Sequence, residues 1–283
     1  MNQPFICAAL RPSSSNNPRK LGGPRYVCGK PPQHEGDHGE WRLVSQVEHA
    51  ELSGSAHFEA TRVAQFMQEL MTLPHLPNVF NPWRDYDAKY DAAETSPDIR
   101  HHNLTRYLTE RVDKAKLILI GEAPGYRGGK FTGIAMTSER ILLGAQSKIP
   151  PERVFIGEKQ RSSAIDACAA GFIEPTASIV WSLLLNLNID SREFMLWNAF
   201  PCHPHKAGEP LTNRKPLPSE LQAAAHVLSA LLKLSTKAQL VAVGRVAEGA
   251  LSALDLPYES VRHPAMGGAS AFRAGIKRLL EKP

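Results

Sequence analysis

The sequence has no run of about 18 apolar residues, so it predicts no membrane-spanning helix. Its amino terminus lacks the charged and then apolar layout of a secretory signal. Four scattered cysteines among 283 residues are too few for a disulfide scaffold. No Gly-Lys-Ser or Gly-Lys-Thr follows a strand, as a phosphate-loop nucleotide enzyme requires. These absences argue against secreted, membrane and phosphate-loop proteins and favour a cytoplasmic location.

What is present is the composition of an ordinary globular protein, 42% hydrophobic and 22% charged. Its length suffices for one large domain or a domain with an appendage. A net charge of +5 and a pI near 9.0 permit a polyanionic partner without requiring one. Two local basic clusters, within residues 11–30 and 206–215, favour such a partner more strongly, although solvated loops would also carry them.

Residues 1–45 differ from the rest, because they are rich in proline, glycine and serine and have little apolar periodicity. They carry Cys7, Cys28, His34 and His38, and two thiolates with two imidazoles form a tetrahedral zinc set. The sequence therefore predicts a structural zinc that would supply the folding energy this small segment lacks. The alternative is a loose tail with incidental cysteines and histidines. A set of four protein ligands leaves no open position, so the site would not be catalytic.

The remainder of the chain alternates strand and helix patterns, which predicts a three-layer α/β/α fold with a central, mainly parallel sheet of four to five strands. We predict a small Cys/His-rich segment at 1–45, a helical and loop lead-in at 46–115, and an α/β core at 116–283. Strands are predicted at 117–120, 154–156, 194–198, 240–244 and 258–262. Helices are predicted at 57–73, 103–112, 138–145, 176–187, 219–232, 246–254 and 271–281, and the proline-rich residues 74–98 predict an irregular surface loop.

Three predicted strands end in residues that carry chemistry. The apolar run at 117–120 is followed by Gly121-Glu122-Ala123-Pro124-Gly125, the run at 194–198 ends at Asn198, and the last strand is followed by His263. In an open parallel sheet, ligands bind at the carboxyl ends of the strands. Any one of these turns could be a mere connection, but together they indicate one site.

These three segments, with His263-Pro264-Ala265 as the last, resemble the three signature motifs of the uracil-DNA glycosylase superfamily. The first is similar to the Gly-Glu-Ala-Pro-Gly form of the family-4 enzymes. The resemblance extends from about residue 116 to the carboxyl terminus. It is to the superfamily and not to family 4 as a whole, because the four cysteines that hold the iron–sulfur cluster in that family are missing. No iron–sulfur cluster is therefore expected.

The resemblance implies a monofunctional DNA glycosylase that flips a deaminated base, uracil first among the candidates, out of DNA and hydrolyses its N-glycosidic bond, leaving an abasic site. It implies that Asn198 reads the base and that His263 stabilises the departing base. Glu122 beside the sugar would orient water, or would act structurally by holding its loop. DNA containing a deaminated base would be the partner, with no metal in the active site. A monomer is expected.

Some positions depart from the family pattern. Met136 stands where a base-stacking aromatic is expected, and either Phe131 or Tyr126 could replace that aromatic by position. Gly125 replaces the tyrosine that rejects thymine in family-1 enzymes, and Ala123 replaces their aspartate. With Gly121, Gly125 would form the wall against the base.

Several residues could meet DNA beyond the base. Met266 could wedge into the base stack, and Lys206, Arg214 and Lys215 could meet phosphates. Because Met136 and Ala123 depart from the pattern, the alternative is a weak or inactive glycosylase-fold protein that binds nucleic acid or a partner protein. A third interpretation is a nucleotide- or phosphate-binding α/β enzyme that uses the Gly121–Gly125 turn.

Overall fold

The computed structural model describes residues 26–28, 41–43 and 46–281, with side chains from residue 58. The chain divides into two compact units, Met1–Glu59 and Ala60–Pro283. In the first unit, strands β1 (Tyr26–Cys28) and β2 (Trp41–Leu43) pair in antiparallel fashion. Cys28 ends β1, but its side chain, like Cys7, His34 and His38, lies outside what is described. The zinc site therefore stays a prediction.

The second unit is built on a four-stranded sheet, whose neighbouring strands all pair in parallel, in the order β5-β4-β7-β8. Its strands are β4 (Leu117–Gly121), β5 (Phe194–Asn198), β7 (Gln239–Val243) and β8 (Glu259–Val261). Every residue of β4 and β5 is buried, as expected for apolar strands covered on both faces. The predicted fold class is confirmed.

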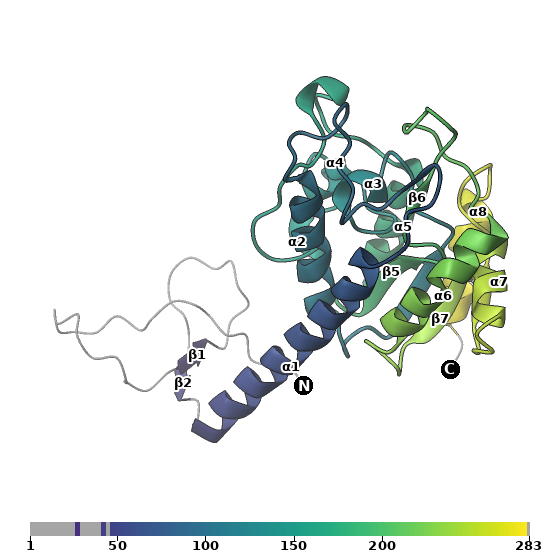
Figure 1. The fold of residues 1–283 in the computed structure, drawn as a ribbon. Coiled ribbons are helices and arrows are strands. Elements are labelled where there is room, and N and C mark those ends of the chain that lie inside the picture. Colours follow the sequence, from purple (N-terminus) through teal and green to yellow (C-terminus); the bar gives the residue numbers. More distant parts are fainter. Residues whose placement is uncertain (1–25, 29–40, 44–45, 282–283) are drawn as a thin grey trace. The chain divides into compact units, whose positions relative to one another are not determined.

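Helices flank the sheet (Figure 1). The second unit contains α2 (Ser96–Thr109), α3 (Gly129–Thr132), α4 (Glu139–Leu142), α5 (Pro175–Asn186), α6 (Pro218–Leu232), α7 (Arg245–Ser252) and α8 (Ala269–Leu280), and α1 (Gln46–Met71) runs across the division between the units. Pro175 and Pro218 open α5 and α6, where the missing N–H has no cost. In the described part of the chain, no helix has the length and apolar character needed to cross a membrane.

The strand order places a crevice at the end of β4. The chain leaves β4 for β5 on one side and then returns past β4 to β7 on the other. In parallel sheets, such a reversal of direction separates the adjoining loops and opens a binding crevice at the carboxyl ends of the strands. Gly121 of β4 pairs in register with Asn198 of β5, so the first two motifs end side by side.

Two predicted segments differ from the structure. Residues 154–156 follow a 3-10 turn (Pro151–Arg153) and form no strand, because Val154 and Phe155 are buried by core packing outside the sheet. Residues 74–98 are not only a surface loop. They contain β3 (Val79–Phe80), which pairs with β6 (His203–Pro204), and the buried Trp83, which stacks on Trp197 of β5 at 6.0 Å between ring centroids.

Candidate active site

A pocket of about 830 Å³ opens at the carboxyl ends of the strands. The Gly121–Gly125 turn lines it after β4, Asn198 at the end of β5, Val243 at the end of β7, and His263 after β8. The three segments that the sequence singled out therefore meet in one cavity.

Asn198 is buried, with 3% of its surface exposed, and its side chain lies over Gly121. A Cβ atom at Gly121 would lie 2.8 Å from Asn198 Oδ1, closer than such atoms approach one another. Glycine at position 121 therefore makes room for the amide. This amide makes no hydrogen bond to another residue in the described part of the chain, so its donors and acceptor are available to a ligand.

Met136 lies next to the same Cβ position of Gly121, with its Sδ and Cε both 3.5 Å from it. It has a left-handed backbone (φ 47°) that methionine rarely adopts. Hydrogen bonds hold this turn, because the Thr132 hydroxyl donates to Thr137 O at 2.8 Å and the Trp181 indole donates to Thr137 Oγ1 at 3.1 Å. A strained residue fixed by its surroundings is typical of a functional site.

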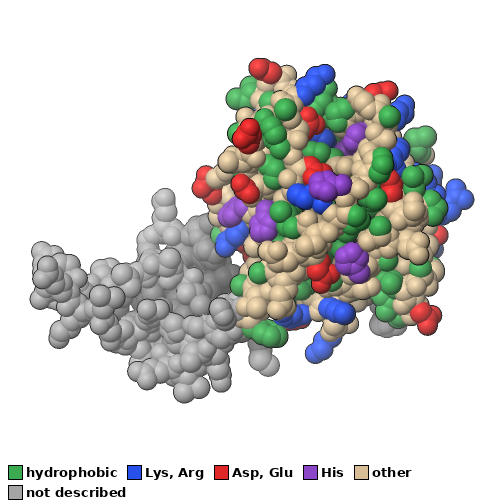
Figure 2. Space-filling model, viewed as in Figure 1, with side chains coloured by type: hydrophobic (Ala, Val, Ile, Leu, Met, Phe, Trp, Pro, Cys, Tyr) green, Lys and Arg blue, Asp and Glu red, His purple; other side chains and the backbone are tan. Residues whose placement is uncertain are grey.

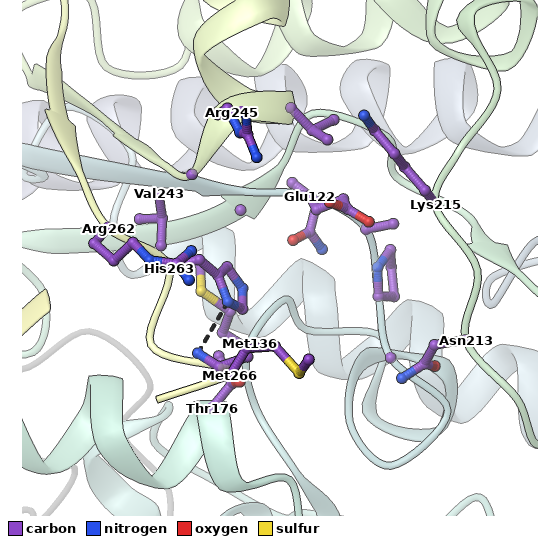
Figure 3. Close-up of a pocket in the computed structure, with 18 of the residues that line it drawn as sticks. Glu122, Met136, Thr176, Asn213, Lys215, Val243, Arg245, Arg262, His263 and Met266 are labelled. Carbon is purple, nitrogen blue, oxygen red and sulfur yellow. Dashed lines mark hydrogen bonds between the residues drawn. The ribbon is translucent and has the colours of Figure 1, made fainter. Parts of the chain in front are cut away.

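His263 has one defined ring orientation. Its Nδ1 accepts a hydrogen bond from the Ala265 N–H at 3.1 Å (Figure 3). Burial and the neighbouring Arg262 lower the pKa of His263, so the ring is neutral near pH 7. With Nδ1 acting as acceptor, the neutral ring carries its proton on Nε2. Gly244 supports the ring, since a Cβ there would lie 3.1 Å from His263 Cβ.

Glu122 lines the pocket with a half-buried side chain. Burial raises its pKa, and Lys215 opposes this rise. Figure 3 shows Glu122 near the centre of the view, with Lys215 and Arg245 on one side and His263 on the other. A carboxylate with a raised pKa is a better proton acceptor than an ordinary surface carboxylate.

Strand β6 and the loop after it hold the Gly121–Gly125 turn through hydrogen bonds. His203 is buried between two carbonyl oxygens, with Nδ1 2.8 Å from Pro124 O and Nε2 3.1 Å from Pro210 O. Burial lowers the pKa of His203 to about 4, so its neutral ring donates to only one of the two. Asn213 Oδ1 accepts the Tyr126 N–H at 3.0 Å. These contacts hold the turn that forms the pocket wall.

The three predicted phosphate-binding residues of this loop lie in different surroundings. Lys215 is exposed at the pocket, whereas Lys206 is exposed but does not line it. Arg214 also lines the pocket, but its guanidinium is bound within the protein. It pairs with Glu220 at 2.6 Å, and its other donors meet the carbonyls of His205, Lys215 and Asn78. Arg214 is therefore a structural residue, and the prediction that it meets phosphate is not supported.

Two further predicted residues lie apart from the deep part of the pocket. Phe131 is buried outside the lining, stacked on Phe172 at 4.6 Å between ring centroids, so it does not face the cavity as a replacement for the missing aromatic. Met266 is 94% exposed at the pocket edge and has a left-handed backbone (φ 54°). That exposure is suited to contact with a partner.

The structure adds pocket residues that the sequence did not single out: Glu174, Thr176, Asn213, Arg245 and Arg262. Arg245 and Arg262 lie next to strand ends, so their proximity to the predicted motifs was a usable signal. Glu174 and Thr176 precede and begin α5, and no local pattern places them at the site.

Metal-binding side chains do not gather in the described part of the chain, where no group of three or more His, Cys, Asp or Glu residues could hold an ion. Cys202 and His203 are buried, and both ring nitrogens of His203 face carbonyl oxygens. The polar side chains that line the described pocket include carboxylate, amide and imidazole groups.

Comparison with known proteins agrees with this site. The sequence profile of the uracil DNA glycosylase superfamily matches residues 110–272, and the chain belongs to that superfamily. It is thus of the DNA glycosylase class, hydrolases that act on DNA.

A crystal structure of wild-type SMUG2 from Pedobacter heparinus shares the fold. It has a TM-score of 0.51 and 14% sequence identity, and the alignment covers 79% of this chain and 99% of that chain. Among curated proteins, no sequence match was found.

Proposed function

We propose that this protein is a monofunctional DNA glycosylase that flips uracil, or a related deaminated base, into the pocket and hydrolyses its N-glycosidic bond. The observation that carries the proposal is the convergence of Asn198, His263 and Glu122 on one pocket at the ends of adjoining strands.

Asn198 would select the base. Its amide has one acceptor for the N3–H of uracil and donors for O4. Cytosine presents the opposite pattern and would leave buried polar groups unpaired, which discriminates strongly between ligands. The side chain is buried and held over Gly121, so the amide is already oriented before the base arrives.

His263 would stabilise the departing base. Cleavage of the glycosidic bond leaves negative charge on the base and positive character on the sugar. The Nε2–H donor of a neutral ring, fixed through the Ala265 N–H, would stabilise the anionic O2 as fixed donors do in an oxyanion hole. Glu122 would lie beside the cationic sugar and accept a proton from the attacking water.

Three cations from different elements surround the pocket. Lys215, Arg245 and Arg262 are exposed, and Figure 3 shows them around Glu122 and His263. On the face in Figure 2, acidic and basic side chains are interspersed, so there the net charge of +5 does not form one broad basic surface. The local cluster supports phosphate contacts next to the flipped nucleotide, and Met266 would fill the gap left in the stack.

The proposal is tested with single- and double-stranded oligonucleotides that carry uracil, hypoxanthine or xanthine, scored for abasic sites. We expect abasic sites from uracil at least. If folded protein cleaves none of these substrates, the catalytic proposal is wrong, and binding of the same oligonucleotides would favour the alternative of an inactive nucleic-acid-binding protein.

We also propose a structural zinc bound by Cys7, Cys28, His34 and His38. Metal analysis of the Cys28→Ser protein tests it, with a loss of bound zinc expected relative to the wild type. An undiminished zinc content would contradict this proposal and leave the glycosylase proposal untouched.

A further inference from the structure

The wall of the pocket contains a carboxyl group that the proposed reaction has not used. Glu174 lies immediately before α5 and lines the pocket next to the Gly121–Gly125 turn. A Cβ atom at Gly125 would lie 3.1 Å from Glu174 Oε1, and one at Gly128 would lie 2.1 Å from Oε2. The carboxyl group therefore occupies the space that side chains at positions 125 and 128 would need.

This carboxyl group has no partner in the described part of the chain. Its Oε2 is buried and makes no hydrogen bond, although the side chain as a whole is part-exposed. It does not cap the helix that follows it. The charged groups of the adjoining segments are directed elsewhere, since Arg127 lies over the Tyr126 ring and Lys130 pairs with Asp87 at 2.8 Å.

An unpaired buried carboxyl group destabilises the fold, most of all when it is ionised. Burial alone raises the pKa of Glu174 to about 7. Near neutral pH much of the protein therefore carries an uncharged carboxyl group, which has an O–H donor. Because Oε2 is enclosed against Gly128, Oε1 is the oxygen through which Glu174 can meet a ligand in the pocket.

We propose that the Glu174 carboxyl group contacts the bound nucleotide and donates a hydrogen bond to one of its acceptor atoms. The inference rests on the proposed function, since it takes the ligand of this pocket to be a flipped deoxynucleotide. Nucleotides carry acceptors on the base and on the phosphates, and both could lie against the Gly125 wall. A hydrogen bond from Oε1 to the ligand would then offset part of the cost of burying the carboxyl group without a partner, while Oε2 stays enclosed.

The test compares the wild type with Glu174→Gln, which keeps a donor at every pH, and Glu174→Met, which keeps the length and loses the donor. Binding is measured at pH 6 and pH 8.5 to an oligonucleotide with 2′-fluorinated deoxyuridine, whose glycosidic bond resists cleavage. A second oligonucleotide has an abasic analogue at that position. Glu248→Gln is the control, because Glu248 lines the same pocket but is hydrogen-bonded to the Ser260 hydroxyl.

We expect wild-type affinity to fall about 10-fold from pH 6 to pH 8.5, as the donor is lost. Glu174→Gln should bind equally at both pH values, and Glu174→Met should bind about 10-fold more weakly than the wild type at pH 6. Glu248→Gln should retain the wild-type pH dependence. Differences restricted to the uracil probe identify a base acceptor, and differences on both probes identify a phosphate acceptor.

Thermal unfolding separates this role from a structural one. Both Glu174 variants should unfold at or above the wild-type temperature at pH 8.5, because the unpaired carboxylate is gone. Variants that lose stability and affinity together, or that bind with wild-type affinity and pH dependence, would overturn the inference. If the wild type releases uracil while the variants bind normally, this inference alone fails; a wild type that neither binds nor cleaves overturns the proposed function as well.

Discussion

At the scale of single residues, His263 is the group on which the proposed chemistry depends most. Burial and the neighbouring Arg262 lower the pKa of His263 below 6.5, the ordinary pKa of a histidine side chain. The ring therefore stays neutral as the pH falls through 6.5. Protonation at Nδ1 would break the hydrogen bond from Ala265 and change the orientation of the ring.

We therefore predict that the His263-dependent acid limb of the single-turnover rate has its midpoint below pH 6.5. The protein to measure carries both Glu122→Gln and Glu174→Gln, because burial raises the pKa of both pocket carboxyl groups and their titration would overlap with that of His263. A midpoint at or above pH 6.5 in that protein would show that the ring is not held neutral by its surroundings.

Gly121 offers a residue-scale test of the position of Asn198. A Cβ atom in Gly121→Ala would force Asn198 Oδ1 away from its position, because the two atoms would lie 2.8 Å apart. Small displacements of catalytic or reading groups are costly, and we expect the rate of base release to fall about 10- to 100-fold. The measurement is the single-turnover rate on a uracil oligonucleotide.

Gly249→Ala is the matched control, since Gly249 lies inside α7 and nothing is within 4 Å of its Cβ position. It should leave the rate unchanged and stabilise the fold by about 1 kcal/mol. Wild-type rates in both alanine variants would mean that Asn198 does not read the base from its observed position.

The sequence predicted Asn198 and His263 because each ends or follows a predicted strand and matches a motif of the family, and topology places both at the same edge of the sheet. It could not predict the neutral Nε2–H form of His263, which depends on the Ala265 N–H and on burial. It could not predict Glu174 either, since that residue reaches the pocket only through the packing of α5 against the Gly125–Gly128 turn.

At the scale of elements, the loop between β6 and α6 contains two neighbouring basic residues with opposite roles. Arg214 pairs with Glu220, which also accepts the Leu217 N–H at the start of α6 at 2.7 Å. Burial alone would raise the pKa of Glu220, but the hydrogen bond from Arg214 lowers it below its ordinary value. Lys215, one residue further on, is exposed at the pocket.

We predict that Arg214→Ala destabilises the fold by about 2–3 kcal/mol, because it leaves Glu220 without its cation. The salt dependence of DNA binding should not change in that variant. For Lys215→Ala we expect the opposite pattern. The free energy of unfolding of this variant should stay within about 0.5 kcal/mol of the wild type. Its slope of log affinity against log salt should become shallower by about 0.7–0.9, the value of one lost phosphate contact.

Chemical denaturation and binding titrations at several salt concentrations measure these quantities. A shallower salt slope in Arg214→Ala with intact stability would restore that residue as a phosphate contact and contradict its structural role.

Elements were predictable where apolar runs were long. The strands at 117–120 and 194–198 were found from their uninterrupted aliphatic or aromatic residues. The three-residue run at 154–156 was wrongly predicted as a strand. The apolar pattern of so short a segment is the same whether the segment joins a sheet or packs beside it. The burial of Trp83 was not predicted, because this residue lies in a proline-rich segment without apolar periodicity. Its stacking on Trp197 is a contact between distant parts of the chain, which no local pattern indicates.

At the scale of the whole molecule, the parallel sheet, the pocket and the family match all lie in the same part of the chain. The parallel pairing of β4 with β5 brings Gly121 beside Asn198, and the superfamily profile covers the same part of the chain, residues 110–272. The sequence identity to the SMUG2 structure is only 14%, so that comparison shows a shared fold and no more. Any selection among bases has to be argued from the residues of this pocket.

The measurement that tests the central claim most directly is the rate of abasic-site formation from a uracil-containing oligonucleotide, compared among the wild type, Asn198→Ala and His263→Ala. We predict measurable formation by the wild type and a loss of at least about 10²-fold in each variant, with all three proteins folded. Equal rates in the three proteins would contradict the assignment of this pocket, and no formation by the wild type would contradict the proposed activity.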